Sequence, residues 1–143
     1  MGKVISVNIS GKTGEKKRPV DAVKLVEDVG VKGDGHAGKD PKRLISLLAE
    51  ESIEKIRAKG IEANPGDFAE NITTEGIILH ELPLGTKLNC GETLLEVTQI
   101  GKECHDRCAI YEQVGDCVMP REGIFARALR GGTVRPGDEI EVL

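Results

Sequence analysis

The sequence predicts a mainly β (α+β) protein, one domain over residues 1–143, folded as a closed or nearly closed β-barrel with one or two helices. Glycine makes up 18 of the 143 residues, and Gly, Pro, Asn and Asp separate many short apolar runs. That pattern is typical of short strands joined by tight turns. One segment has the spacing of an amphipathic helix. Closure is favoured because it removes exposed strand edges.

The first half of the chain supplies strands and that helix. Residues 3–10 (KVISVNIS) alternate, with Ile5, Val7 and Ile9 on one side of a half-buried strand. Residues 21–34 are rich in β-branched side chains and end in a Gly-rich turn, and residues 43–48 (RLISLL) form a short apolar run. In residues 49–60, Ile53 and Ile56 share one face and charged side chains cover the other. A glycine follows where such a helix ends.

Three strands are predicted in the second half of the chain. Residues 85–101 (GTKLNCGETLLEVTQIG) contain two strands that join at a turn over residues 90–92. The tail has a Pro-Gly-Asp turn at residues 136–138, which leads into a last strand. No internal repeat or linker interrupts the chain.

Charge and composition exclude several classes of function. The net charge is -4 with a sequence pI near 5.5, and aromatic residues make up 2%, so a nucleic-acid-binding surface is not expected. No apolar run is long enough to span a membrane, and the N-terminus lacks the apolar stretch of a signal peptide. A cytoplasmic location follows as an expectation. Cysteines stay reduced there, which disfavours a disulfide.

A first polar cluster occupies residues 32–43 (KGDGHAGKDPKR). Its glycines let backbone N–H groups approach a ligand, and Lys39 and Arg43 add positive charge, so an anion site is one interpretation. A solvated turn is the other, with His36 held by local hydrogen bonds. The spacing is not that of a phosphate-binding P-loop.

A second polar cluster follows a turn at residues 64–66. Glu70, Asn71, Thr73 and Thr74 precede the apolar pair of isoleucines at 77 and 78. Polar groups in an apolar strand need partners. Asn71 and Thr73 therefore either line a polar pocket or satisfy local backbone groups.

The segment from residue 100 to residue 120 holds three of the four cysteines. A metal cluster, a disulfide and a reactive thiolate are all open interpretations. A structural zinc site usually combines two close pairs of ligands, whereas Cys104 and Cys108 have C-x3-C spacing and no second pair follows. Neighbouring Lys102 and Arg107 favour the thiolate form. Cys90, in the turn between two strands, is assigned to structure.

Two arginines follow the cysteines. Arg121 and Arg127 lie among apolar residues, either as contacts for an anion or on a solvated face.

Taken in order, four blocks of this sequence resemble the MOSC domain, which is named for the C-terminal domain of molybdenum cofactor sulfurases. The blocks are GDGHAGK (33–39), PGDFAENITTEGI (65–77), IGKECHDRC (100–108) and GDCVMPREGIFARALRGGTVRPGDEIEV (115–142). The resemblance is to the small stand-alone type and extends from about Val20 to Leu143. It implies a β-rich barrel with few helices.

The resemblance also implies a function. In the family a cysteine carries sulfur as a persulfide or ligates the molybdenum of a bound pterin cofactor, and the counterparts here are Cys104 and Cys108. Cys104 follows its strand as the thiol of single-cysteine relatives does. Cys108 follows an arginine, as the metal-binding thiol of C-x2-C relatives does. The C-x3-C spacing is one residue longer than that pair, and Cys104 is preferred.

The expected cofactor is therefore the molybdenum cofactor, a phosphorylated pterin dithiolene. Cationic and N–H donors would hold its phosphate, and amide and hydroxyl groups its pterin. The expected binding residues are His36, Lys39, Arg43, Asn71, Thr73, Arg121 and Arg127.

Three functions remain open at this level. The first is a carrier of molybdenum cofactor, or of sulfur for it, during molybdoenzyme maturation, with sulfurtransferase activity as its enzymatic form. The second is a molybdenum-dependent reductase of N-hydroxylated compounds, and the third a structural Cys/His zinc module. The first implies a cysteine desulfurase partner, which would bring the pyridoxal phosphate, and a recipient molybdoenzyme.

Overall fold

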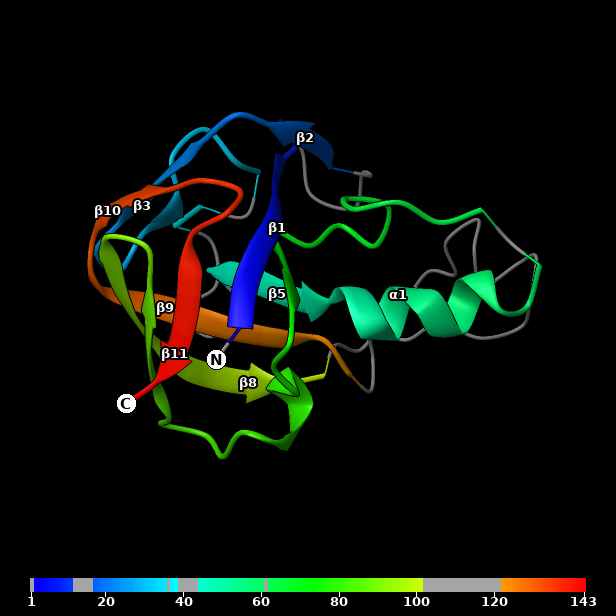
Figure 1. Cartoon of the computed structure of the whole chain (residues 1–143). Helices are drawn as coiled ribbons and strands as arrows, with labels where there is room; N and C mark the ends of the chain where they lie inside the picture. Colours follow the sequence, from blue (N-terminus) through cyan, green and yellow to red (C-terminus); the bar gives the residue numbers. More distant parts are fainter. Residues whose placement is uncertain (1, 12–16, 36, 39–43, 61, 102–121) are drawn as a thin grey trace.

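The computed structural model describes residues 2–11, 17–35, 37–38, 44–60, 62–101 and 122–143. Its elements in chain order (Figure 1) are β1 (Gly2–Ile9), β2 (Arg18–Val20), β3 (Val23–Val26), β4 (Gly30–Val31), β5 (Ile45–Ala49), α1 (Glu50–Arg57), β6 (Ile72–Glu75), the 3-10 helix η1 (Leu79–Glu81), β7 (Lys87–Cys90), β8 (Thr93–Ile100), β9 (Ile124–Arg130), β10 (Gly132–Val134) and β11 (Glu139–Val142).

Seven strands close into a barrel in the order β11-β7-β8-β9-β5-β6-β1, and β1 pairs with β11 to complete the ring. The closing pair joins Gly2 to Ile140 and Lys3 to Glu139, so the two ends of the chain lie side by side. β2 extends the sheet beyond β1, and β10, β3 and β4 form a separate three-stranded sheet. The predicted mainly β closed barrel is therefore confirmed.

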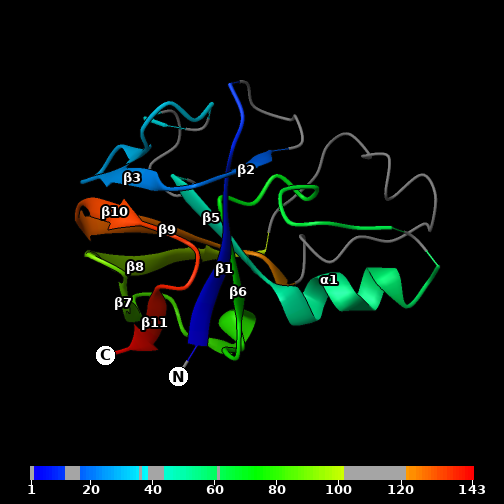
Figure 2. The same cartoon turned by 45° about the horizontal axis from the view of Figure 1, so that its top comes forward.

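The pair β5–β6 is parallel, whereas the other pairings of the barrel are antiparallel. A parallel pair needs a long crossover connection. Here α1 and the loop after it supply that connection. Figure 2 shows α1 extending away from the end of β5 to one side of the barrel, with the loop returning to the start of β6.

The helix forms where the sequence predicts it. α1 covers Glu50–Arg57, with acidic residues in its first turn and basic residues in its last, as the helix dipole favours. Ile53 and Ile56 are its buried apolar residues. Gly60, with a φ of 86°, takes the left-handed conformation just after the helix.

The apolar core fills the barrel with aliphatic residues from nearly every strand, among them Val4, Leu47, Ile72, Leu95 and Ile140. Leu48, Ile53, Ile56, Phe68 and Phe125 are buried but lie outside that cluster. α1 contacts β5 and β6, so this second apolar layer belongs to the outer face of the barrel.

The first strand departs from simple alternation. The pairing of β1 with β6 shifts register between Val4 and Ser6. Consequently Val4 and Val7 enter the core, whereas Ile5 and Ile9 are only partly buried. Ser6 and Asn8 are buried as well, because the other face of β1 is also covered.

None of the helices among the described residues is long and apolar enough to cross a membrane.

Candidate functional site

Three of the predicted site residues, Asn71, Thr73 and Arg127, lie within the described part of the chain. The others lie outside the described residues, and their roles stay predictions: His36, Lys39, Arg43, Cys104, Cys108 and Arg121.

Asn71 joins three strands at the point where β6 begins. Its Oδ1 accepts hydrogen bonds from the N–H and the hydroxyl of Ser46, both at 3.1 Å. Its Nδ2 donates to the backbone carbonyl of Asn8 at 3.2 Å. The side chain is fully buried. Its amide thus satisfies groups of β5 and β1 that are 25 and 63 residues away rather than the local backbone, and contact with a ligand stays a prediction.

Thr73 lies in a chain of hydrogen bonds between β1 and β6. Ser6 Oγ donates to Asn8 Oδ1 at 2.7 Å. Asn8 Nδ2 donates to Thr73 Oγ1 and to the carbonyl of Glu70, both at 3.2 Å. Thr73 Oγ1 in turn donates to Glu70 Oε2 at 2.8 Å. All four side chains are buried, so the chain is shielded from water and ends at a carboxyl group.

Glu70 is the unusual member of this network. It is fully buried, and burial raises the pKa of its carboxyl to about 7. Backbone N–H groups of Gly66, Glu70 and Phe68 and the hydroxyl of Thr73 lower that pKa, but burial outweighs them. Oε1 has no hydrogen-bond partner among the described residues. Glu70 belongs to the second polar cluster of the sequence but is not among the predicted site residues. The available signal was an acidic residue shortly before a predicted strand.

The loop around Glu70 is fixed by a close backbone approach. Gly66 has a φ of 92°, and a Cβ there would lie 2.2 Å from the carbonyl oxygen of Lys17. Lys17 N–H donates to the carbonyl of Gly66 at 2.8 Å. Ala69, with a φ of 63°, is also in the left-handed region. Position 66 therefore requires glycine, because its backbone turns against the backbone of Lys17.

A buried ion pair lies beside this loop. Lys17 Nζ contacts Asp34 Oδ1 at 2.7 Å, and neither side chain is exposed. Asp34 Oδ1 also accepts the N–H of Ser10 at 3.1 Å, and the N–H of Gly35 donates to the carbonyl of Ser10 at 2.8 Å. These contacts hold the start of the first polar cluster against the end of β1.

Arg127 lies on β9, apart from Asn71 and Thr73. Its Nε donates to Glu96 on β8 at 2.9 Å, and its guanidinium is 3.5 Å from Asp28. The side chain is 40% exposed, so these pairs are weak and the guanidinium stays accessible to an anion. No contact between the described residues joins it to the buried network.

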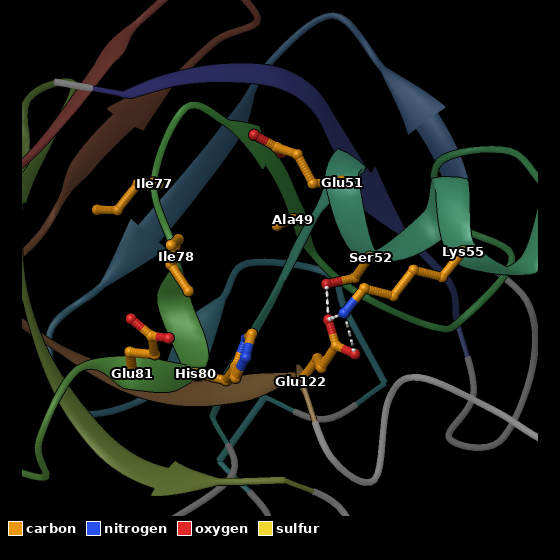
Figure 3. Close-up of a pocket in the computed structure, with 9 residues that line it drawn as sticks. All are labelled: Ala49, Glu51, Ser52, Lys55, Ile77, Ile78, His80, Glu81 and Glu122. Atoms are coloured by element: carbon orange, nitrogen blue, oxygen red, sulfur yellow. Dashed lines mark hydrogen bonds and ion pairs between the residues drawn. The ribbon is translucent and has the colours of Figure 1, made fainter.

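The two ends of the cysteine segment are fixed to the barrel. Gly101 N–H, after β8, donates to the carbonyl of Gly123 at 2.7 Å. Glu122 accepts hydrogen bonds from Ser52 Oγ at 2.7 Å and from Lys55 Nζ at 2.8 and 2.9 Å. Burial alone raises the pKa of Glu122, but the bonds from Lys55 and Ser52 hold it below its usual value. Figure 3 shows both donors reaching the carboxylate from α1.

A pocket of about 470 Å³ opens beside Glu122. Ala49, Ile77 and Ile78 give it apolar walls, and its other lining residues are Glu51, Ser52, Lys55, His80, Glu81 and Glu122 (Figure 3). The pocket therefore lies beside Glu122, shortly before β9 begins.

Cys90 takes no part in a metal site. It lies in the barrel core without solvent exposure, and burial, aided by the charge of Asp138, raises the pKa of its thiol to about 12. A protonated, enclosed thiol cannot supply the fourth ligand of a zinc site. The assignment of Cys90 to structure is confirmed. Within the described residues, no group of three or more His, Cys, Asp or Glu side chains could hold a metal ion.

A comparison with protein families matches residues 33–141 to the MOSC domain. The chain belongs to the MOSC domain family. The match includes every predicted site residue, from His36 to Arg127. MOSC domains are associated with functions related to the molybdenum cofactor, so the resemblance drawn from the four sequence blocks is confirmed at the level of the family. No curated protein matches the chain significantly.

Solved structures share the MOSC fold. YuaD from Bacillus subtilis is 20% identical, with a TM-score of 0.82, and the alignment covers 99% of this chain and 96% of that one. YiiM from Geobacillus stearothermophilus is 22% identical, with a TM-score of 0.74 and coverage of 100% and 75%. YiiM from Escherichia coli is 21% identical, with a TM-score of 0.68 and coverage of 100% and 70%. At these identities the likeness shows the fold alone.

Proposed function

We propose that this MOSC protein binds the molybdenum cofactor, or carries sulfur for it, through Cys104 or Cys108. The observation that carries the proposal is the family match, which extends over residues 33–141 and so includes the whole cysteine segment. Membership of the family does not by itself show whether Cys104 or Cys108 is the reactive cysteine. Cys104 is preferred because it follows β8 closely, after Gly101.

The described residues support a cofactor in two ways. The flanks of the cysteine segment are anchored, through Gly101 on one side and Glu122 on the other, so the segment has a defined origin on the barrel. Glu70 Oε1 is a buried acceptor without a partner among the described residues, and such atoms are rare unless a ligand or water completes them.

The chemistry assigned to the chain is that of a thiolate. When bound, the cofactor would supply a soft, oxophilic metal, for which a cysteine thiolate is a suitable ligand. For sulfur transfer, the thiolate attacks the outer sulfur of a donor persulfide. A new S–S bond forms on the attacking cysteine, the donor S–S bond breaks, and the donor leaves as a thiolate. The proton of the terminal S–H group moves with the transferred sulfur.

Sulfur transfer requires partners. A cysteine desulfurase with its own pyridoxal phosphate would provide the persulfide, and a molybdoenzyme would receive the cofactor. The donors that would hold the anionic cofactor are His36, Lys39, Arg43, Arg121 and the half-exposed Arg127.

The test is metal and pterin analysis of protein expressed in a molybdenum-replete host. We expect bound molybdenum and pterin, or a persulfide detected by mass spectrometry, to be lost in Cys104→Ser or Cys108→Ser. Cys117→Ser is the matched control, because it removes a thiol from the same segment. Turnover of amidoximes by the loaded protein would instead favour the reductase. Stoichiometric zinc, or the absence of metal, pterin and persulfide together, would contradict the proposal.

A further inference from the structure

The pocket beside Glu122 combines apolar and acidic walls (Figure 3). Its volume of about 470 Å³ lies within the range of small-molecule sites in proteins, which are mostly apolar with a few polar groups. Ile78 is 56% exposed beside the buried Ile77, so the free protein leaves a large apolar side chain of the pocket in contact with water. Covering that side chain favours a ligand with an apolar body.

The charged side chains of the pocket do not balance. The acidic ones are Glu51, Glu81 and Glu122. Lys55 and His80 supply at most two positive charges against these three. The remaining described residues of the lining carry no charge. A cavity with an excess of negative charge attracts a cation and repels an anion.

Glu122 is already neutralised within the protein. Both of its oxygens accept hydrogen bonds from Lys55 Nζ, at 2.8 and 2.9 Å, and Ser52 Oγ donates to one of them at 2.7 Å. Burial alone would raise the pKa of Glu122, but these bonds hold it below its ordinary value, and the charge of His80 adds to their effect. Lys55 is therefore engaged, and Glu122 forms part of the wall rather than the partner of a ligand cation.

The other two acids keep oxygens available for a ligand. Glu51 Oε2 accepts the N–H of Gly76 at 2.8 Å, and no bond from the described residues reaches its Oε1. The carboxylate of Glu81 has neither a hydrogen bond nor an ion pair within the part of the chain that the structure describes. Figure 3 shows Glu51 above and Glu81 below Ile78 in that view. Negative charge without an internal partner thus accompanies the apolar wall.

We propose that this pocket binds a small organic ammonium ion with an apolar body, of which an arylalkylamine is the simplest example. The apolar body packs on Ala49, Ile77 and Ile78. The ammonium group donates charge-assisted hydrogen bonds to Glu81, and the charge of Glu51 adds attraction. The inference goes beyond the proposed function, because no residue predicted to hold the molybdenum cofactor is among the described residues that line this pocket.

The experiment compares three probes of similar shape, benzylamine, benzyl alcohol and benzoate, in NMR titrations of protein with labelled isoleucine methyl groups. We expect the wild type to bind benzylamine about three- to fivefold more tightly than the alcohol, because a partly exposed ion pair contributes modestly. Benzoate should bind more weakly than the alcohol. Glu81→Gln should remove the advantage of the amine and leave the alcohol unchanged. Glu141→Gln, which removes an exposed acid of β11 outside the pocket lining, should change neither.

The methyl signals also locate the ligand. Those of Ile77 and Ile78 should shift on titration, whereas those of Ile140 in the barrel core should not. Ile78→Ala should weaken the amine and the alcohol alike, by about threefold or more, because it removes apolar contact area. The fold should tolerate this substitution, since the side chain is largely exposed in the free protein.

Equal binding of benzylamine and benzyl alcohol, undiminished amine binding by Glu81→Gln, shifts confined to other isoleucines, or no binding of any probe would each overturn the proposal. Loss of benzylamine binding in Cys104→Ser would assign the amine to the cofactor site instead and would overturn it as well. Molybdenum and persulfide analysis of the cysteine variants judges the proposed function separately.

Discussion

The stability of the protein should depend on pH through Glu70. Burial raises the pKa of its carboxyl to about 7 in the folded protein, from the ordinary glutamate value of about 4.5 that holds in the unfolded chain. Between these values the folded state binds more protons than the unfolded state, so the free energy of unfolding falls as pH rises. The loss begins near the unfolded pKa and is complete once the pH exceeds the folded pKa. Below the unfolded pKa the neutral acid carries no such penalty.

The magnitude follows from the difference between the two pKa values. One pKa unit corresponds to about 1.4 kcal/mol, so the full loss is on the order of 3 kcal/mol. Glu70→Gln cannot titrate and should lack this component. Other acidic groups titrate in both proteins, and their contributions cancel when the two are compared. The free energy of unfolding of Glu70→Gln relative to the wild type should therefore rise by on the order of 3 kcal/mol from about pH 4 to about pH 9.

Urea denaturation of both proteins at a series of pH values measures this difference. Asp67→Asn is the control, since its difference from the wild type should not show that rise around pH 7. Parallel curves for Glu70→Gln and the wild type would refute the reasoning, because they would mean that the buried carboxyl is as easily ionised as an exposed one.

Three other substitutions test the packing around the site. Lys17→Met should lower the free energy of unfolding by about 3–5 kcal/mol in urea denaturation, because it removes one partner of a buried ion pair. Gly66→Ala should cost more than about 1 kcal/mol, because its Cβ would lie 2.2 Å from a backbone oxygen at a φ of 92°. Ser52→Ala should cost about 1–3 kcal/mol, because it removes the 2.7 Å hydrogen bond to Glu122, and should raise the pKa of that carboxyl in an NMR titration.

Controls sharpen these predictions. Gly60→Ala shares a positive φ of 86° but meets no atom within 4 Å, so it should be milder than Gly66→Ala. Equal losses would show that the close approach at Gly66 is unimportant. Replacing Lys17 and Asp34 together by Met and Leu should cost less than Lys17→Met alone, and a larger loss would contradict the ion-pair argument. An unchanged Glu122 pKa in Ser52→Ala would contradict the role given to that hydroxyl.

Local patterns in the sequence determined much of the architecture. The two strands around the turn at Gly91, the helix over Ile53 and Ile56, and the last strand after Pro136 were all predicted, because neighbouring residues set their periodicity and turns. The order of four motif blocks determined the family. The roles of Cys104 and Cys108 remain predictions that rest on the resemblance to this family.

Only the tertiary structure determined the burial, the hydrogen-bond partners and the pKa of Glu70. Its hydrogen-bond network reaches Asn8, 62 residues away, and the loop around it is fixed by Lys17. The parallel pairing of β5 with β6 and the register shift in β1 bring these groups together and exclude water. A sequence shows that a residue is acidic, whereas its pKa depends on burial and on partners that distant strands supply.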